Sequence, residues 1–128
     1  MSITVCTGKL HRVTVTNAKL DYEGSITLDP VLMAAAGIAP FQLVHINSLS
    51  NAVHWETYAI PGRPESGEVQ LNGCPARLFQ PGDKVIILSL EQIERAQAPA
   101  IEQRVVHVDG SNRIAQVVIK RPTDAPHG

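Results

Sequence analysis

The side chains of this chain that could take part in chemistry are hydroxyl, phenol, amide and amine groups near turns and strand ends. The central stretch is Tyr22-Glu23-Gly24-Ser25, a polar break between two strand-like runs. Taken alone, Gly24-Ser25 is an ordinary turn dipeptide, because glycine and serine are both common in turns. Around it the chain carries Lys9 and His11 upstream, and Thr57-Tyr58 and Asn72-Gly73 downstream.

Metal and cofactor motifs of the familiar kinds are absent from the sequence. Cys6 and Cys74 form no CxxC pair, and the five histidines show no ligand spacing. There is no Walker loop, no GxGxxG after a strand and no GxSxG elbow. We therefore predict no metal site and two reduced, packed thiols. Without a cofactor made from its own residues, such a chain would have little chemistry.

The stretches around residues 8–16, 22–25, 56–60 and 69–73, in this order and nearly without gaps, resemble the bacterial aspartate 1-decarboxylases. These small pyruvoyl-dependent enzymes make β-alanine, a precursor in pantothenate and coenzyme A biosynthesis. The resemblance is dense from residue 8 to about 90 and includes the self-cleavage site of the family, Gly24-Ser25. It implies a self-processing carboxy-lyase, cleaved between Gly24 and Ser25 into a β chain, 1–24, and an α chain, 25–128.

The implied cofactor is a pyruvoyl group formed from Ser25. Decarboxylation of an α-amino acid leaves two electrons on the α-carbon, and a carbonyl condensed with the substrate amine as a Schiff base can accept them. By resemblance, Ser25 Oγ attacks the carbonyl of Gly24 and converts the peptide bond to an ester. Elimination and hydrolysis then give the pyruvoyl group. A glycine before the serine suits a strained backbone and an open approach.

The resemblance also implies roles for the other candidate site residues. Tyr58 resembles the proton donor of the family, and a phenol with an ordinary pKa of about 10 is protonated at neutral pH. Thr57 resembles the threonine that polarises the carbonyl during cleavage and binds substrate, and Asn72 matches the asparagine beside the pyruvoyl group. The remaining implied residues are Tyr22 and His11 near the cleavage point, Lys9 near the substrate carboxylate, and the turn Gly73-Cys74-Pro75.

Strand geometry limits how Thr57 and Tyr58 can act together. Strict alternation along a strand puts Thr57 and Tyr58 on opposite faces. Both can then serve one centre only at a strand end or across a subunit boundary. For His11 we favour a hydrogen-bonded supporting role over a catalytic one.

The sequence departs from the family pattern in the substrate pocket. His54 stands where the family has an arginine that binds the substrate carboxylate, Asn47 stands where it has tryptophan, and Cys74-Pro75 replaces Ala-Ala. Arginine is always charged and bidentate, whereas histidine as a residue type is often neutral at pH 7. The loss of one charged hydrogen bond costs about ten- to a hundredfold in binding or rate. Three hypotheses stay open: an aspartate decarboxylase, the same enzyme type acting on another amino acid, and an unprocessed barrel with a binding role.

The elements that must position these residues are mostly strands. Many short strands with little helix predict a small β-barrel or sandwich, and periodicity cannot choose between them. The resemblance implies a six-stranded double-psi β-barrel with short helices, assembled as a homotetramer with active sites between subunits. The predicted strands are 9–16, 20–28 interrupted at Gly24, 41–46, 53–60, 68–71, 84–90, and a hairpin of 104–108 with 113–120.

Other local signals are capping and alternation patterns. Asp29-Pro30 predicts the start of a helix that ends at Gly37. Residues 91–97 favour a helical turn, and 121–128 read as a flexible tail. Within 9–16, alternation puts one set of side chains on each face of the strand: Lys9, His11, Val13 and Val15 on one, and Leu10, Arg12, Thr14 and Thr16 on the other.

Size, composition and charge exclude several classes of protein. With 128 residues, of which 44% are hydrophobic and 18% charged, we expect one globular domain, 1–128. The net charge is −1 and the basic residues are scattered, so no nucleic-acid partner is predicted. No apolar run approaches the roughly 20 residues of a membrane span, and no signal peptide is recognisable. We expect a cytoplasmic protein whose partner is a small amino-acid substrate.

Overall fold

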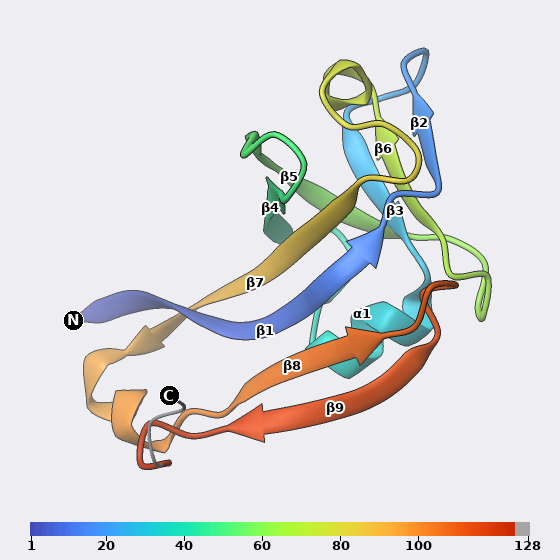
Figure 1. Ribbon diagram of the computed structural model, residues 1–128. Coiled ribbons are helices and arrows are strands. Elements are labelled where there is room, and N and C mark those ends of the chain that lie inside the picture. The colour runs from blue at the N-terminus through green and yellow to red at the C-terminus, as the bar shows by residue number, and fades with distance from the viewer. Residues whose placement is uncertain (125–128) are drawn as a thin grey trace.

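The computed structural model describes residues 1–124, which form a mainly β fold with short helices (Figure 1). The predicted class is therefore confirmed. The helices are α1 (Pro30–Ala36) and two short 3₁₀ helices, η1 (Cys74–Arg77) and η2 (Arg95–Ala100). The strands are β1 (Ser2–Thr14), β2 (Asn17–Lys19), β3 (Ser25–Leu28), β4 (Leu43–Ser48), β5 (His54–Pro61), β6 (Val69–Asn72), β7 (Lys84–Glu94), β8 (Gln103–Val108) and β9 (Ile114–Lys120).

The strands are hydrogen-bonded in the order β2-β6-β3-β5-β4-β7-β1-β8-β9. Three neighbouring pairs are parallel, namely β1 with β8, β2 with β6 and β3 with β5. Parallel neighbours need crossover connections, which an up-and-down meander lacks. The mixture of parallel and antiparallel pairs is what a barrel with crossing connections requires, and it places segments far apart in sequence side by side.

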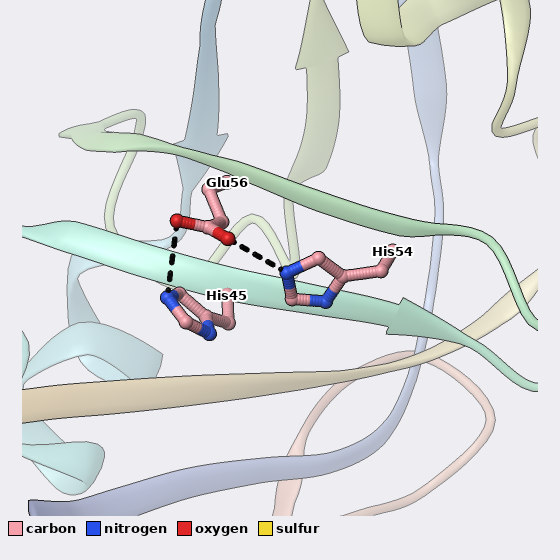
Figure 2. Close-up of side chains that lie close together, drawn as sticks. All are labelled: His45, His54 and Glu56. Atoms are coloured by element: carbon pink, nitrogen blue, oxygen red, sulfur yellow. Dashed lines mark hydrogen bonds and ion pairs between the residues drawn. The ribbon is translucent and has the colours of Figure 1, made fainter.

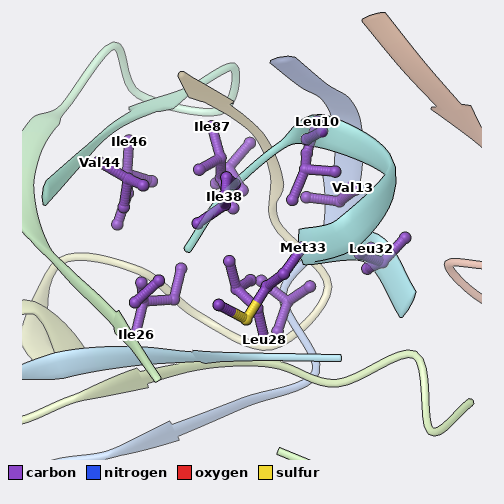
Figure 3. Close-up of a cluster of buried hydrophobic side chains, with 14 of the residues drawn as sticks. Leu10, Val13, Ile26, Leu28, Leu32, Met33, Ile38, Val44, Ile46 and Ile87 are labelled. Atoms are coloured by element: carbon purple, nitrogen blue, oxygen red, sulfur yellow. The ribbon is translucent and has the colours of Figure 1, made fainter. Parts of the chain in front are cut away.

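One apolar core lies inside the curled sheet (Figure 3). Its buried side chains come from most strands and from α1, with Leu10, Ile26, Val44, Leu71, Ile87 and Val106 from the strands and Leu32 from the helix. Because each fully buried side chain of this size contributes about 1.5–3 kcal/mol, this shared burial holds the crossing strands together. The polar groups of the site are therefore carried on a rigid frame.

Helix α1 forms where the sequence predicts it. The side chain of Asp29 accepts a hydrogen bond from the amide of Val31 (2.9 Å), and Pro30 occupies the first turn. Gly37 ends the helix with φ +74°, a conformation that favours glycine. The helix packs against β1 and β8, so it closes one side of the core.

Strand β1 contains a bulge that the sequence pattern does not reveal. Its pairing with β7 shifts register between Leu10 and Val13, and Arg12 has φ +60°. Because of this extra residue, the side chains that follow it point to the face of the sheet opposite to the one that strict alternation predicts. The predicted division of 9–16 into two faces is therefore wrong, because Leu10 is buried together with Val13. Lys9 and His11 remain partly exposed.

Two further expectations change near the C-terminus. The predicted helical turn over 91–97 is wrong in its first half, because β7 continues to Glu94. Glu94 pairs with Ser2, since β1 begins at Ser2 and not at residue 9 as predicted. Of the predicted flexible tail, residues 121–124 form a turn in which the amide of Arg121 donates to Asp124 Oδ2 (2.7 Å). Residues 125–128 lie outside the described residues. Over residues 1–124, no helix is both long enough and apolar enough to cross a membrane.

Candidate functional site

A pocket of about 340 Å³ lies at the break between β2 and β3. Several of the predicted site residues line it: Tyr22, Gly24, Thr57, Gly73, Cys74 and Pro75. Leu20, Trp55 and Glu56 also line the pocket and were not predicted. The structure thus brings together residues from the 20–25 break, from β5 and from the start of η1.

Ser25 follows Gly24 directly and is 1% exposed, so its hydroxyl lies behind the pocket wall in a hydrogen-bond network. Ser25 Oγ accepts a hydrogen bond of 3.0 Å from Nδ2 of Asn72 and donates one of 3.1 Å to the carbonyl oxygen of Glu23. The same Nδ2 donates to Oγ1 of Thr27 (2.9 Å). Asn72 Oδ1 accepts from Nε2 of Gln70 (2.7 Å). The network fixes the direction in which the Ser25 hydroxyl points.

The register of β3 on β6 produces this network. The two strands are antiparallel, with Ser25 opposite Asn72 and Thr27 opposite Gln70. The side chain of Asn72 can therefore reach both hydroxyl groups on the neighbouring strand. Asn72 is fully buried, and a buried amide without partners would be costly, so its position depends on these contacts.

The glycine whose lack of Cβ the site requires is Gly73. Its φ is +79° and its ψ −141°, a region that is open almost only to glycine. A Cβ at Gly73 would lie 2.9 Å from Cα of Gly24 and 3.1 Å from the carbonyl oxygen of Tyr22. A Cβ at Gly24, by contrast, would meet no atom within 4 Å. The open approach predicted at Gly24 is present, whereas its backbone shows no positive φ that would strain another residue.

Thr57 and Tyr58 lie on opposite faces of β5, as alternation predicts. Thr57 is buried and lines the pocket, whereas the ring of Tyr58 packs near that of Phe41, with 6.1 Å between the centroids. The parallel pairing of β3 with β5 starts at Ile26 opposite Ala59. The backbone of Thr57 and Tyr58, just before Ala59, therefore lies beside the N-terminal end of β3, where Ser25 is.

Lys9 and His11 lie away from this pocket. They are on β1, and three strands, β5, β4 and β7, separate β1 from β3 in the sheet. His11 contacts His107 edge to face, with 5.1 Å between the ring centroids. Burial, followed by the nearby charges of His107, Arg12, Lys9 and Lys120, lowers the pKa of His11. Burial and the positive surroundings thus both favour the neutral imidazole of His11.

His54 lies outside the pocket lining, in a polar cluster on the outer face of β4 and β5 (Figure 2). Nδ1 of His54 donates to Oδ1 of Asn47 (2.7 Å), and Nε2 lies 3.0 Å from Oε2 of Glu56. Oε1 of the same carboxylate lies 3.4 Å from Nε2 of His45. The hydrogen bond from His54, followed by the charge of His45, lowers the pKa of Glu56.

The pocket can support attack of a hydroxyl on a neighbouring carbonyl. Ser25 Oγ is held by one donor and one acceptor beside the Gly24 peptide bond, in surroundings that exclude bulk water. Within residues 1–124 no buried side-chain nitrogen or oxygen lacks a hydrogen-bond partner. An amide that donates to a hydroxyl oxygen is equally suited to a carbonyl oxygen at the same position, because both are acceptors.

The unpredicted residues could have been found only in part from the sequence. Trp55 and Glu56 directly precede Thr57, so their place near the site follows once β5 is located. Leu20 and Thr27 flank the Gly24-Ser25 break, but only the pairing of β3 with β6 shows that Thr27 shares a donor with Ser25. Cross-strand contacts of this kind leave no linear spacing.

Comparisons with known proteins agree with these observations. Residues 1–115 match the sequence model of a family described as aspartate decarboxylase. Aspartate 1-decarboxylase of Clostridium beijerinckii is 47% identical over 117 residues, which cover 91% of this chain and 94% of the relative. Aspartate 1-decarboxylase of Leptospira biflexa is 48% identical over 114 residues, covering 88% and 97%. The matches include the whole of the pocket described above.

Proposed function

Because the chain belongs to the aspartate decarboxylase family, we propose that it is a self-processing carboxy-lyase that converts L-aspartate to β-alanine and carbon dioxide. The observation that carries the proposal is the buried hydroxyl of Ser25. It lies next to the Gly24 peptide bond behind a pocket and is held by Asn72. The names of the relatives favour aspartate over another amino acid. A cytoplasmic location stays a prediction.

Processing begins in this proposal with Ser25 Oγ. A bond forms between Oγ and the carbonyl carbon of Gly24, the bond from that carbon to the Ser25 nitrogen breaks, and the hydroxyl proton passes to the nitrogen. Loss of the Cα proton of residue 25 then breaks the Cβ–O bond and leaves a free Gly24 carboxylate and a dehydroalanine. Water replaces the nitrogen of that residue, and ammonia leaves. Chains 1–24 and 25–128 result.

The residues around Ser25 fit the pyruvoyl group that this sequence of steps leaves. Nδ2 of Asn72, which now donates to Oγ, can donate to a carbonyl oxygen there. Thr57 and the Gly73-Cys74-Pro75 turn line the adjacent space, which is large enough for a small amino acid. When present, the group supplies the electron sink that α-decarboxylation needs. Tyr22, near the cleavage point, also lines this space.

Substrate binding and proton transfer need residues that lie outside the pocket of one chain. We assign Tyr58 as the donor of a proton to the α-carbon once carbon dioxide has left, and Lys9 and His54 as the cations for the substrate carboxylates, with His11 in support. Lys9 and Ser25 are on strands separated by three others. A homotetramer with sites between subunits supplies Lys9, His54 and Tyr58 from a neighbouring copy.

A decarboxylation assay tests the proposal. Processed protein is incubated with L-aspartate and, separately, with a panel of other amino acids, and both carbon dioxide and the amine product are measured. We expect release from L-aspartate with equimolar β-alanine, and none with Ser25→Ala protein. Release from another amino acid alone would identify a different decarboxylase, and an intact chain without activity would leave the unprocessed barrel with a binding role.

A further inference from the structure

The outer face of the β4–β5 hairpin carries four polar side chains in two directly opposed pairs. His45 is opposite Glu56, and Asn47 is opposite His54. Each pair of neighbours on one strand is two residues apart, so all four side chains point to the same side of the sheet. Ile46, between His45 and Asn47, and Val44, before His45, are fully buried, which places the four on the face that points away from the core.

The ligand-type atoms of this cluster converge. One ring nitrogen of His45, one of His54 and one carboxylate oxygen of Glu56 all lie within 4.8 Å of one another, and Figure 2 shows Glu56 contacting both rings. The side chains are 25%, 45% and 50% exposed, so they can move together without a change in the backbone. The free side of the cluster is open to water.

Asn47 orients one of the two rings. Its Oδ1 can only accept a hydrogen bond, so Nδ1 of His54, at 2.7 Å, carries a hydrogen. Nε2 of His54, 3.0 Å from Oε2 of Glu56, is then the ring nitrogen left for a metal ion, which would replace the hydrogen shared with the carboxylate. Ligating histidines in metalloproteins are commonly fixed in this way, by donating the other ring nitrogen to a neighbouring oxygen.

We propose that His45, His54 and Glu56 bind one divalent transition-metal ion, with Zn²⁺ the best match. Two imidazole nitrogens and one carboxylate oxygen are a ligand set that suits Zn²⁺ and its neighbours in the first row. Mg²⁺ and Ca²⁺ prefer oxygen ligands alone. Water completes the coordination on the exposed side. The sequence predicted no metal site because the ligands are brought together by cross-strand pairing, which has no linear spacing.

A plain ion pair between Glu56 and a histidine is the competing explanation. An exposed ion pair contributes little to the stability of the fold. It also needs neither a second histidine on the same carboxylate nor an oriented ring. The other histidine pair of the described chain gives a contrast. His11 and His107 lie near Lys9, Arg12 and Lys120, whose charges repel a cation. That pair should not bind a metal.

Glu56 also lines the pocket, so a bound ion would neutralise negative charge at its edge. An ion held by His54 would take the place of that side chain's own charge as the cation for a substrate carboxylate. This consequence rests on the proposed function, because it matters for an anionic substrate. The metal site itself does not rest on that function, and its test is a binding measurement without catalysis.

The test uses tag-free, full-length protein freed of metal with a chelator. Calorimetric titration with ZnCl₂ near neutral pH should give saturable binding of one ion per chain. Because an ion that binds only the folded protein stabilises it, the thermal unfolding midpoint should rise with Zn²⁺ and not with Mg²⁺. His45→Gln and Glu56→Gln should each abolish the Zn²⁺-dependent rise. The matched control, His107→Gln, should bind as wild type does. Asn47→Ala should weaken binding by about 10–100-fold.

Circular dichroism of the variants without metal should match wild type, because none of the substituted side chains is buried in the core. Co²⁺ in place of Zn²⁺ should give absorption without the strong near-ultraviolet bands of thiolate ligation. Absence of saturable Zn²⁺ binding would overturn the proposal. So would binding that survives in both His45→Gln and Glu56→Gln, binding that is lost in His107→Gln, or thiolate bands that identify Cys6 or Cys74 as the ligand.

Discussion

Asn72 donates a hydrogen bond of 3.0 Å from its side-chain amide to Oγ of Ser25, and the two residues are buried directly opposite each other on β6 and β3. The same amide group donates to Thr27. Because contacts with Thr27 and Gln70 fix the side-chain amide of Asn72, it holds the Ser25 hydroxyl in one orientation before any bond is broken. The cleavage chemistry proposed above therefore starts from a preorganised hydroxyl.

The first prediction concerns cleavage itself. Denaturing mass spectrometry of wild-type protein after warm incubation should show fragments 1–24 and 25–128, the larger one lighter by one ammonia than a serine-ended chain. Ser25→Ala should remain intact, because no hydroxyl is left to attack Gly24. An intact wild-type chain would contradict self-processing, provided that any activator of cleavage has been supplied.

Asn72→Ala should slow cleavage and destabilise the fold. The substitution removes the shared donor of Ser25 and Thr27 and leaves a buried gap, at a cost of about 1–3 kcal/mol. A similar loss in the transition state would slow cleavage by about ten- to a hundredfold. The fraction cleaved over time and the unfolding midpoint measure both effects. Gln116→Ala, at an exposed amide side chain on β9, is the control and should change neither. Cleavage of Asn72→Ala at the wild-type rate would remove Asn72 from the machinery.

Gly73→Ala should disturb the cleavage point more than a comparable substitution elsewhere. The added Cβ would lie 2.9 Å from Cα of Gly24, and the backbone conformation costs any other residue about 1–3 kcal/mol. Gly82→Ala is the matched control, since Gly82 also has a positive φ, +95°, but open space around it. We expect a larger fall in the unfolding midpoint and slower cleavage for Gly73→Ala. Equal behaviour of the two variants would mean that the close approach to Gly24 does not matter.

Tyr58→Phe should still be cleaved but lose turnover. The phenylalanine ring keeps the contact with Phe41 and removes only the hydroxyl that we assign as the proton donor. General acids of this kind contribute about 10²–10⁴-fold to rate. Carbon dioxide release per cleaved chain is the measurement, with Phe41→Leu as a control for packing at the same contact. Full turnover of cleaved Tyr58→Phe would show that another group supplies the proton.

The pH dependence of stability should contain a contribution from His11. Its pKa is lower in the folded protein than the ordinary value of 6.5, because of burial and then the charges of His107, Arg12, Lys9 and Lys120. The unfolded chain therefore binds more protons between the folded and the unfolded pKa, so stability falls as pH drops below about 6.5. His11→Gln should reduce the fall in unfolding midpoint between about pH 7.5 and pH 5.5.

Salt separates the two causes of the lowered His11 pKa. Added salt screens the charges of His107 and the nearby lysines and arginine, whereas it leaves the burial of the ring unchanged. The difference between wild type and His11→Gln should therefore shrink at high salt without vanishing. A wild-type midpoint that falls no more steeply than that of His11→Gln would contradict the assignment.

The local elements could be predicted where the signal lies within a few consecutive residues. Asp29, Pro30 and Gly37 define α1, because capping groups act within one turn of the helix. The opposite faces of Thr57 and Tyr58 follow from the two-residue period of a strand. That Leu10 and Val13 share the buried face could not be predicted, because the bulge at Arg12 depends on how β1 pairs with β7.

By itself, the sequence determined the candidate cleavage pair, most of the pocket-lining residues and the mainly β class, since these depend on residue types at fixed spacings and on a resemblance carried by them. Only the tertiary structure decided which side chains meet. The register of β3 on β6 gives Ser25 its donor, and the register of β4 on β5 places His45 and His54 around one carboxylate. Strand order separates Lys9 from Ser25. Contacts across strands depend on the folding of distant segments together, and no local pattern encodes them.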